Sequence, residues 1–136
     1  MYVINKDEKS IYVTRGDAIL FDVDAKNKNG NKYTFVFGDL LRMKIYKKKN
    51  AKEVVLQKDF LVTKNNSQTV QIYLSGEETK LGDIISKPLD YWYEIELNPD
   101  TEPQTIIGYD EDGAKIFKLF PEGADAEAFA AERSKR

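Results

Sequence analysis

The chain has 136 residues, of which 41% are hydrophobic and 12% aromatic, and its formal net charge is −2. This length fits one domain with its own core, and the aromatic content excludes an intrinsically disordered chain. Cysteine and histidine are both absent, which excludes disulfides, Ser–His triads and metal sites built on Cys or His. An enzyme would have to use carboxylates, Lys, Tyr or Arg.

Alternation of apolar and polar residues with a period of two dominates the chain. A strand points successive side chains to opposite faces, so each alternating run predicts a half-buried strand. The β-branched and aromatic residues in these runs favour the same assignment. In chain order the predicted strands are Ile11–Val13, Ile19–Val23, Tyr33–Phe37, Leu41–Tyr46, Val54–Val62, Val70–Leu74, Tyr91–Leu97, Gln104–Tyr109 and Ala114–Phe120.

Turn residues separate these runs. Asn27–Asn31, Gly38-Asp39 and Lys64–Ser67 are polar breaks between apolar stretches, and the cluster Lys47–Lys49 is interpreted as an exposed hairpin loop. Short strands with regular turns predict an all-β fold over residues 1–120, either an antiparallel β-sandwich or a barrel. Of the two, we expect the antiparallel β-sandwich. The residues expected inside it are Ile19, Phe21, Val23, Leu41, Met43, Ile45, Val70, Ile72, Leu74, Tyr93 and Ile95.

A second segment, residues 121–136, is predicted to be a helical tail. Residues 124–136 are rich in alanine, with acids at the start and bases at the end, which complements a helix dipole. So short a helix is marginal alone in water. We therefore expect it to dock, on this domain or on a neighbouring subunit, and we favour a neighbouring subunit or a larger particle. The face expected to make this contact contains Ala126, Phe129, Ala130 and Arg133.

Two motifs that could carry chemistry have simpler structural interpretations. Arg15-Gly16-Asp17 is the tripeptide read by integrins, but its place between two strands favours a turn. Glu94 and Glu96 lie on one predicted strand face, whereas glycoside hydrolysis needs two carboxylates facing each other across a substrate. We select no catalytic, cofactor-binding or metal-binding residue.

Trp92 is the residue most suggestive of binding. By alternation it shares a face with Glu94 and Glu96, opposite Tyr91 and Tyr93. An outward-facing Trp is typical of a contact hot spot. The alternative is that both faces of this strand are covered, or that the register is inverted.

Six segments carry a resemblance to a known family. They are Arg15–Val23, Gly38–Tyr46, Thr69–Leu74 with Thr79, Tyr91–Leu97, Thr105–Gly108 and Gly113–Pro121. Together they resemble the N-terminal domains of phage baseplate upper proteins, and small virion proteins of tailed phages that infect Gram-positive bacteria. The resemblance implies an immunoglobulin-like β-sandwich that attaches to a phage or prophage particle, with no catalytic residue and no cofactor.

Baseplate upper proteins usually continue into a long receptor-binding region, whereas this sequence has one domain and a short tail. We therefore expect a non-enzymatic capsid decoration protein that binds capsid or tail proteins, in multiple copies or as a homo-oligomer. The alternatives are a baseplate or tail adaptor that attaches receptor-binding proteins, and a carbohydrate- or host-surface-binding module with Trp92, Tyr46 and Tyr73 as its sugar platform.

The location expected from the sequence is the virion, assembled in the host cytoplasm. The N-terminus lacks the basic-then-apolar order of a signal peptide, and no run of eighteen apolar residues occurs. The charge balance is not basic, and no nucleic-acid-binding module is recognisable. We therefore expect neither a membrane nor a nucleic acid among the partners.

Overall fold

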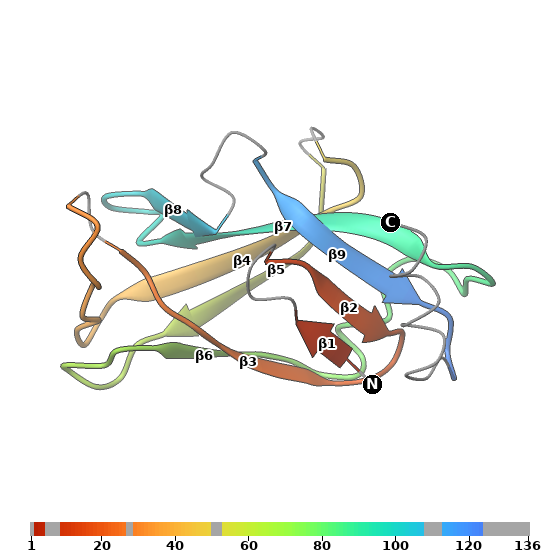
Figure 1. The fold of residues 1–136 in the computed structure, drawn as a ribbon, viewed down its shortest axis with the longest axis horizontal. Coiled ribbons are helices and arrows are strands. Elements are labelled where there is room, and N and C mark those ends of the chain that lie inside the picture. Colours follow the sequence, from red (N-terminus) through yellow and green to blue (C-terminus); the bar gives the residue numbers. More distant parts are fainter. Residues whose placement is uncertain (1, 5–8, 27–28, 50–52, 108–112, 124–136) are drawn as a thin grey trace.

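The computed structural model describes residues 2–4, 9–26, 29–49, 53–107 and 113–123. Over these residues the chain is all-β and contains no helix (Figure 1). The strands are β1 (Tyr2–Ile4), β2 (Ile11–Thr14), β3 (Ile19–Val23), β4 (Leu40–Tyr46), β5 (Val54–Leu61), β6 (Val70–Leu74), β7 (Leu89–Leu97), β8 (Gln104–Ile107) and β9 (Lys115–Phe120).

The strands form a seven-stranded sheet and a two-stranded sheet. The larger sheet has the order β1-β2-β9-β7-β4-β5, with β8 also paired to β7, and the smaller sheet pairs β3 with β6. In Figure 1, β3 and β6 run along the lower side of the molecule, with β4, β7 and β9 above them. The described part of the chain is therefore built from two sheets of unequal size.

The prediction of a wholly antiparallel arrangement is wrong at one pair. β2 and β9 run parallel, with Ile11 opposite Phe117 and Thr14 opposite Phe120, so the larger sheet is mixed. A tight hairpin forces its two strands to be antiparallel, whereas parallel strands need a long connection. β2 and β9 are separated by most of the domain, so no turn between them dictates their direction.

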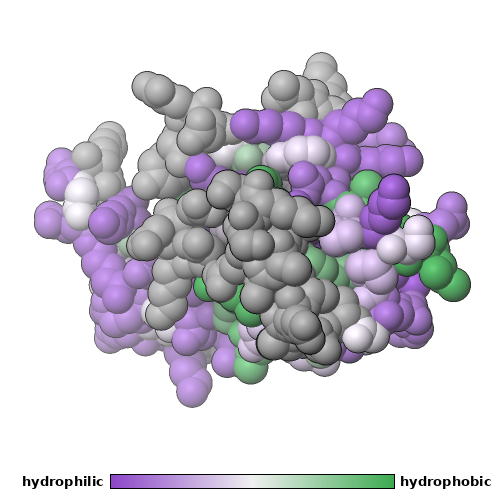
Figure 2. Space-filling view, turned by 45° about the vertical axis from the view of Figure 1, so that its right-hand side comes forward, coloured by the Kyte–Doolittle hydropathy of each residue, from purple (hydrophilic) through white to green (hydrophobic). Residues whose placement is uncertain are grey.

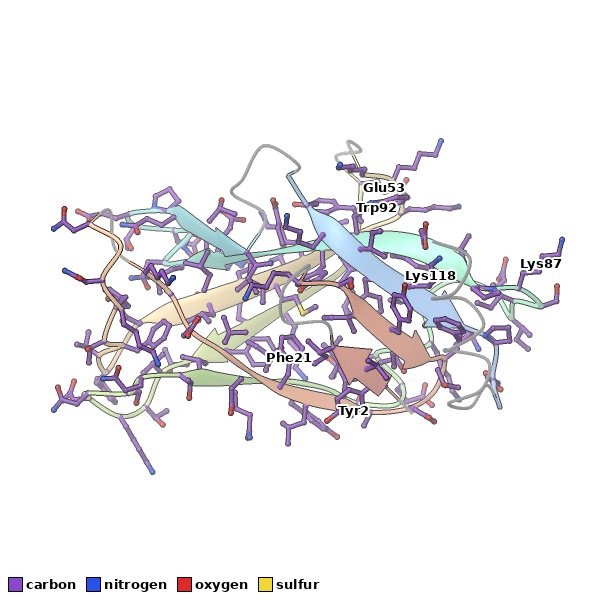
Figure 3. All side chains as sticks on the ribbon, viewed as in Figure 1. Tyr2, Phe21, Glu53, Lys87, Trp92 and Lys118 are labelled. Atoms are coloured by element: carbon purple, nitrogen blue, oxygen red, sulfur yellow. The ribbon has the colours of Figure 1, made fainter. Side chains whose placement is uncertain are left out.

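One hydrophobic core lies between the two sheets. Alternate residues of β4 and β7 are buried, and they pack with the inward residues of β3 and β6. The predicted interior is confirmed: nine of its members are buried in this core, and Phe21 and Val70 are partly buried against it. Phe21 is labelled on β3 in Figure 3. The nine buried residues are Ile19, Val23, Leu41, Met43, Ile45, Ile72, Leu74, Tyr93 and Ile95.

One strand assignment from the sequence is wrong, and one strand was not predicted. Residues 33–37 form no strand: Phe35 makes an isolated bridge to Ser67, and the Phe37 backbone N–H donates to the side chain of Asn65 at 2.9 Å. Side-chain acceptors and turn geometry thus replace a strand ladder in this segment. Conversely, residues 2–4 form β1, which pairs with β2 although it is too short to show clear alternation.

The Arg15-Gly16-Asp17 segment is the turn between β2 and β3. Gly16 has a φ of +93°, a conformation that favours glycine. The Arg15 side chain is only 9% exposed, because its guanidinium donates to the Glu122 carboxylate at 2.6 Å and to the Gly82 carbonyl at 2.9 Å. The arginine therefore joins three loops and is not displayed to a receptor.

The shared core predicts a contrast between two leucines on the paired strands β3 and β6. Leu74 is fully buried, whereas Leu20 is 43% exposed. Leu74→Ala removes buried methyl groups and leaves a cavity, so it should lower the free energy of unfolding by about 2–5 kcal/mol. Leu20→Ala is the matched control and should change it by less than about 1 kcal/mol. Urea unfolding measures both values, and equal losses would contradict the assigned faces.

Candidate functional site

The candidate site is the outer face of the larger sheet, the side turned away from β3 and β6. Trp92 lies on this face and is half-buried, while its neighbours Tyr91 and Tyr93 are 3% and 1% exposed on the inner face. The structure thus places Trp92 on the same side as Glu94 and Glu96, as the alternation predicted. The inverted register is excluded.

Trp92 belongs to a row of large side chains that crosses four strands. In the strand pairing, Trp92 lies opposite Tyr46 on one side and Ile116 on the other, and Tyr46 lies opposite Val54. We call these four residues the Trp92 strip. Val54 is 38% exposed and the other three are half-buried. Figure 3 shows Trp92 at the same end of the sheet as Glu53, the residue before β5.

The acidic residues beside the strip are paired across strands. The Tyr46 hydroxyl donates to the Glu94 carboxylate at 2.5 Å, and the Lys44 ammonium lies 2.9 Å from the Glu96 carboxylate. Burial, followed by this hydrogen bond, raises the pKa of Tyr46, which keeps the hydroxyl protonated as a donor. Glu94 and Glu96 therefore lie side by side on one strand with partners of their own, and do not face each other across a substrate.

A second set of paired charges continues the same face. Arg42 donates to Asp59 on β5 at 2.8 Å and to Asp100 at 3.1 Å. The hydrogen bond from Arg42 lowers the pKa of Asp59. This effect is larger than the opposing effect of burial, which raises the pKa. Each exposed ion pair contributes little stability. Their shared effect is geometric, because these partners hold long charged side chains in place along the outer face of β4, toward the end away from the Trp92 strip.

Tyr73 does not join this site. It lies on β6, 46% exposed on the outer side of the smaller sheet, opposite Leu20. Its ring contacts the Lys58 ammonium, which lies 5.0 Å from the ring centroid and donates to the Tyr73 carbonyl at 2.7 Å. The expected sugar platform of Trp92, Tyr46 and Tyr73 is therefore wrong as a set, because only the first two are neighbours.

Sequence reasoning missed the loop between β3 and β4, which presents an exposed Phe37. The carboxylate of Asp39, only 7% exposed, accepts hydrogen bonds from the Tyr33 hydroxyl at 2.8 Å, the Val36 N–H at 3.0 Å and the Asn98 side chain at 3.1 Å. These contacts hold Phe37, which is 66% exposed. The Gly38-Asp39 pair predicted the turn, but the distant partner Asn98 gave no signal in sequence.

The remaining predicted site residues lie in the C-terminal segment. Ala126, Phe129, Ala130 and Arg133 are outside the described residues. Within the described ranges, no group of three or more acidic residues is arranged to hold a metal ion, and no helix is long and apolar enough to cross a membrane. Outside the atoms drawn in grey, hydrophilic atoms predominate on the face shown in Figure 2, with small separate hydrophobic areas.

Comparison of the chain with models of protein families, with curated proteins and with solved structures found no match. The arguments for function therefore start from the residues of this chain, above all from the Trp92 strip and its paired charges.

The buried carboxylate of Asp39 predicts a pH-dependent contribution to stability. Burial raises its pKa, but the hydrogen bonds from Val36, Asn98 and Tyr33 outweigh this effect and hold the pKa below its ordinary value. The folded state therefore binds the proton less tightly than the unfolded state. The resulting stability is present above about pH 4, the ordinary Asp pKa, and is lost as the pH falls through the lower, folded value.

Asp39→Asn removes this titration and weakens the three hydrogen bonds. At pH 7 it should lower the free energy of unfolding by about 1–3 kcal/mol, and the difference from wild type should shrink as the pH approaches about 2. The control is Asp22→Asn, at an exposed position on β3. Urea unfolding across this pH range measures the effect. A difference between Asp39→Asn and wild type that is constant with pH contradicts the role assigned to the carboxylate.

Proposed function

We propose that this chain is a non-enzymatic structural protein of a bacteriophage particle that decorates the capsid and binds other particle proteins through the Trp92 strip. The observation that carries the binding role is the position of Trp92, which is partly exposed on the outer sheet face beside Glu94 and Glu96, two acids that have partners on β4. A partly buried Trp has few side-chain rotations to lose on binding, and Trp is enriched in interface hot spots.

We also propose that the fold is immunoglobulin-like. Immunoglobulin domains place strands B and E in one sheet and strands C, F and G in the other, with C′ added beside C in variable-type domains. The observed order fits this scheme with β3 and β6 as B and E, β4, β7 and β9 as C, F and G, and β5 as C′. This correspondence supports the resemblance to baseplate upper-protein N-terminal domains, from which the assignment to a phage particle comes.

The paired acids favour binding over hydrolysis as the role of this face. A hydrolase built on Glu94 and Glu96 needs one carboxyl with a raised pKa and a second positioned across the substrate. Here the Glu94 carboxylate accepts a hydrogen bond from the Tyr46 hydroxyl, and Glu96 forms an ion pair with Lys44. These contacts give both residues a structural role.

The first test is whether the protein is part of a particle. Mass spectrometry of particles purified from the strain that encodes this chain should detect it. A copy number close to that of the major capsid protein, or a fixed fraction of it, supports capsid decoration, whereas a few copies per particle point to a baseplate or tail adaptor. Absence from purified particles contradicts the proposal.

The second test addresses the Trp92 strip. Particles assembled without this protein are mixed with purified wild type, Trp92→Ala or Tyr73→Ala, and bound protein is measured after sedimentation. Loss of a hot-spot Trp costs about 2 kcal/mol or more, so Trp92→Ala should bind at least about thirtyfold more weakly. Tyr73→Ala, an exposed aromatic on the other sheet, should bind like wild type. Equal binding of all three proteins places the contact elsewhere.

A carbohydrate-binding role is the second candidate, favoured by the direct pairing of Tyr46 with Trp92. Two adjacent aromatic side chains can stack on the apolar face of a sugar ring. A glycan array distinguishes the two roles: specific sugar binding that Trp92→Ala abolishes, without binding to particles, favours this second candidate.

A further inference from the structure

The smaller sheet has two edges at which no described strand is paired. Among the described strands, β3 and β6 pair only with each other, with Leu20 opposite Tyr73 and Asp22 opposite Gln71. The carbonyls of Leu20 and Tyr73 both accept hydrogen bonds from outside this sheet. The backbone groups of this pair, and of the pair two residues along, therefore point to the free edges. Such edges can accept a strand from another molecule.

Side chains from the larger sheet cap both of these edges. The Tyr2 hydroxyl on β1 donates to the Leu20 carbonyl at 2.8 Å, and Figure 3 labels Tyr2 beside β3. The Lys58 ammonium on β5 donates to the Tyr73 carbonyl at 2.7 Å. β1 and β5 are the two end strands of the larger sheet. Each end strand thus supplies one donor to an acceptor that an added strand would need.

The edge of β6 is capped at a donor as well as at an acceptor. The Lys58 ammonium lies 2.7 Å from the Glu78 carboxylate, which accepts the backbone N–H of Ser75 at 2.9 Å. The Tyr73 carbonyl and the Ser75 N–H are successive groups on the same edge, because residues two apart along a strand point their backbone groups to the same side. The Lys58–Glu78 ion pair therefore fills two groups that a neighbouring strand would otherwise fill.

The surroundings of Lys58 make its charge costly to cover. Lys58 lies opposite Met43, on the inner side of β5, and its side chain is 27% exposed. Its ammonium lies 5.5 Å from the ring centroid of Phe60 and 5.0 Å from that of Tyr73. A strand added to β6 would take the Tyr73 carbonyl from the ammonium and remove the remaining water, which a charged group resists. An inward-pointing charge on an edge strand is one device by which proteins prevent strand addition.

We propose that the Lys58–Glu78 pair closes the free edge of β6 against strand addition, and that β6 of a second copy of this chain adds there when the ammonium is removed. Antiparallel pairing of two β6 strands can place Gln71 of each copy opposite Tyr73 of the other. The freed Tyr73 carbonyl then accepts the Gln71 N–H. This inference does not depend on the proposed function.

The first test removes the ammonium by Lys58→Val, which keeps a residue suited to a strand. The matched control is Lys44→Val. Lys44 is 26% exposed and lies 2.9 Å from Glu96, so a similar ion pair is lost, but β4 is paired on both sides. A second control, Lys58→Arg, keeps the charge and the donors.

Self-association of these proteins is measured by sedimentation velocity over a range of concentrations. Lys58→Val should associate more tightly than wild type by about tenfold or more in dissociation constant. Lys44→Val and Lys58→Arg should sediment like wild type. Equal association of Lys58→Val and wild type, or equal gains in both valine variants, overturns the proposal.

Hydrogen exchange then locates the contact and separates it from a general loss of stability. The Gln71 and Tyr73 amides should exchange about tenfold or more slowly in associated Lys58→Val than in wild type. Adding Gln71→Pro removes one donor at a position where an edge strand tolerates proline, and should restore the sedimentation of wild type. Unchanged or faster exchange at these two amides overturns the proposal. Lys58→Met, which keeps the length of the stem, replaces Lys58→Val if that variant does not fold.

Discussion

The packing of the two sheets against each other is the constraint on which the rest of the structure depends. Full burial of a large aliphatic or aromatic side chain contributes about 1.5–3 kcal/mol relative to an exposed position. Met43, Ile95 and Ile72, all at most 1% exposed, come from both sheets. Successive side chains of a strand point to opposite faces, so the burial of these residues in the core also determines which of their neighbours face outward.

The burial of these core residues determines which side chains lie on the outer face of the larger sheet. With Ile45 and Tyr93 directed inward, Tyr46 and Trp92 are directed outward and become cross-strand neighbours. Their surroundings are polar but already paired, as the contact between Lys44 and Glu96 shows. The core thus directs Tyr46 and Trp92 outward, where the proposed binding partner would meet them, and the cross-strand pairs restrain Tyr46 and the charged side chains beside them.

The sequence alone predicted the parts of the fold that depend on local periodicity. Alternation correctly assigned the inward residues of β4, such as Leu41 and Met43, and the outward position of Trp92. It failed where distant partners decide the structure. The parallel pairing of β2 with β9 joins the two ends of the domain, and the segment around Phe35 is held by Ser67 and by the buried carboxylate of Asp39. Periodicity within a short window contains no information about such partners.

The same distinction applies to the candidate site. The face of Trp92 could be read from β7 alone, but its pairing with Tyr46 and the position of Tyr73 on the other sheet required the order of the strands. The burial of Tyr12 was missed for a related reason. Tyr12 alternates with Ile11 and Val13 as a solvent-facing residue would, but Lys118 and Phe120 of β9, a strand distant in sequence, pack against its ring.

The central claim is that the Trp92 strip, partly exposed in the free protein, becomes covered on a phage particle. Trp92 is the only tryptophan of the chain, so replacing it biosynthetically with 5-hydroxytryptophan allows selective excitation among the tryptophans of particle proteins. Acrylamide quenching is then measured for the free and the particle-bound protein. The account predicts that the quencher reaches the indole in the free protein and that its access falls severalfold on binding. Quenching that is the same in both states would contradict it.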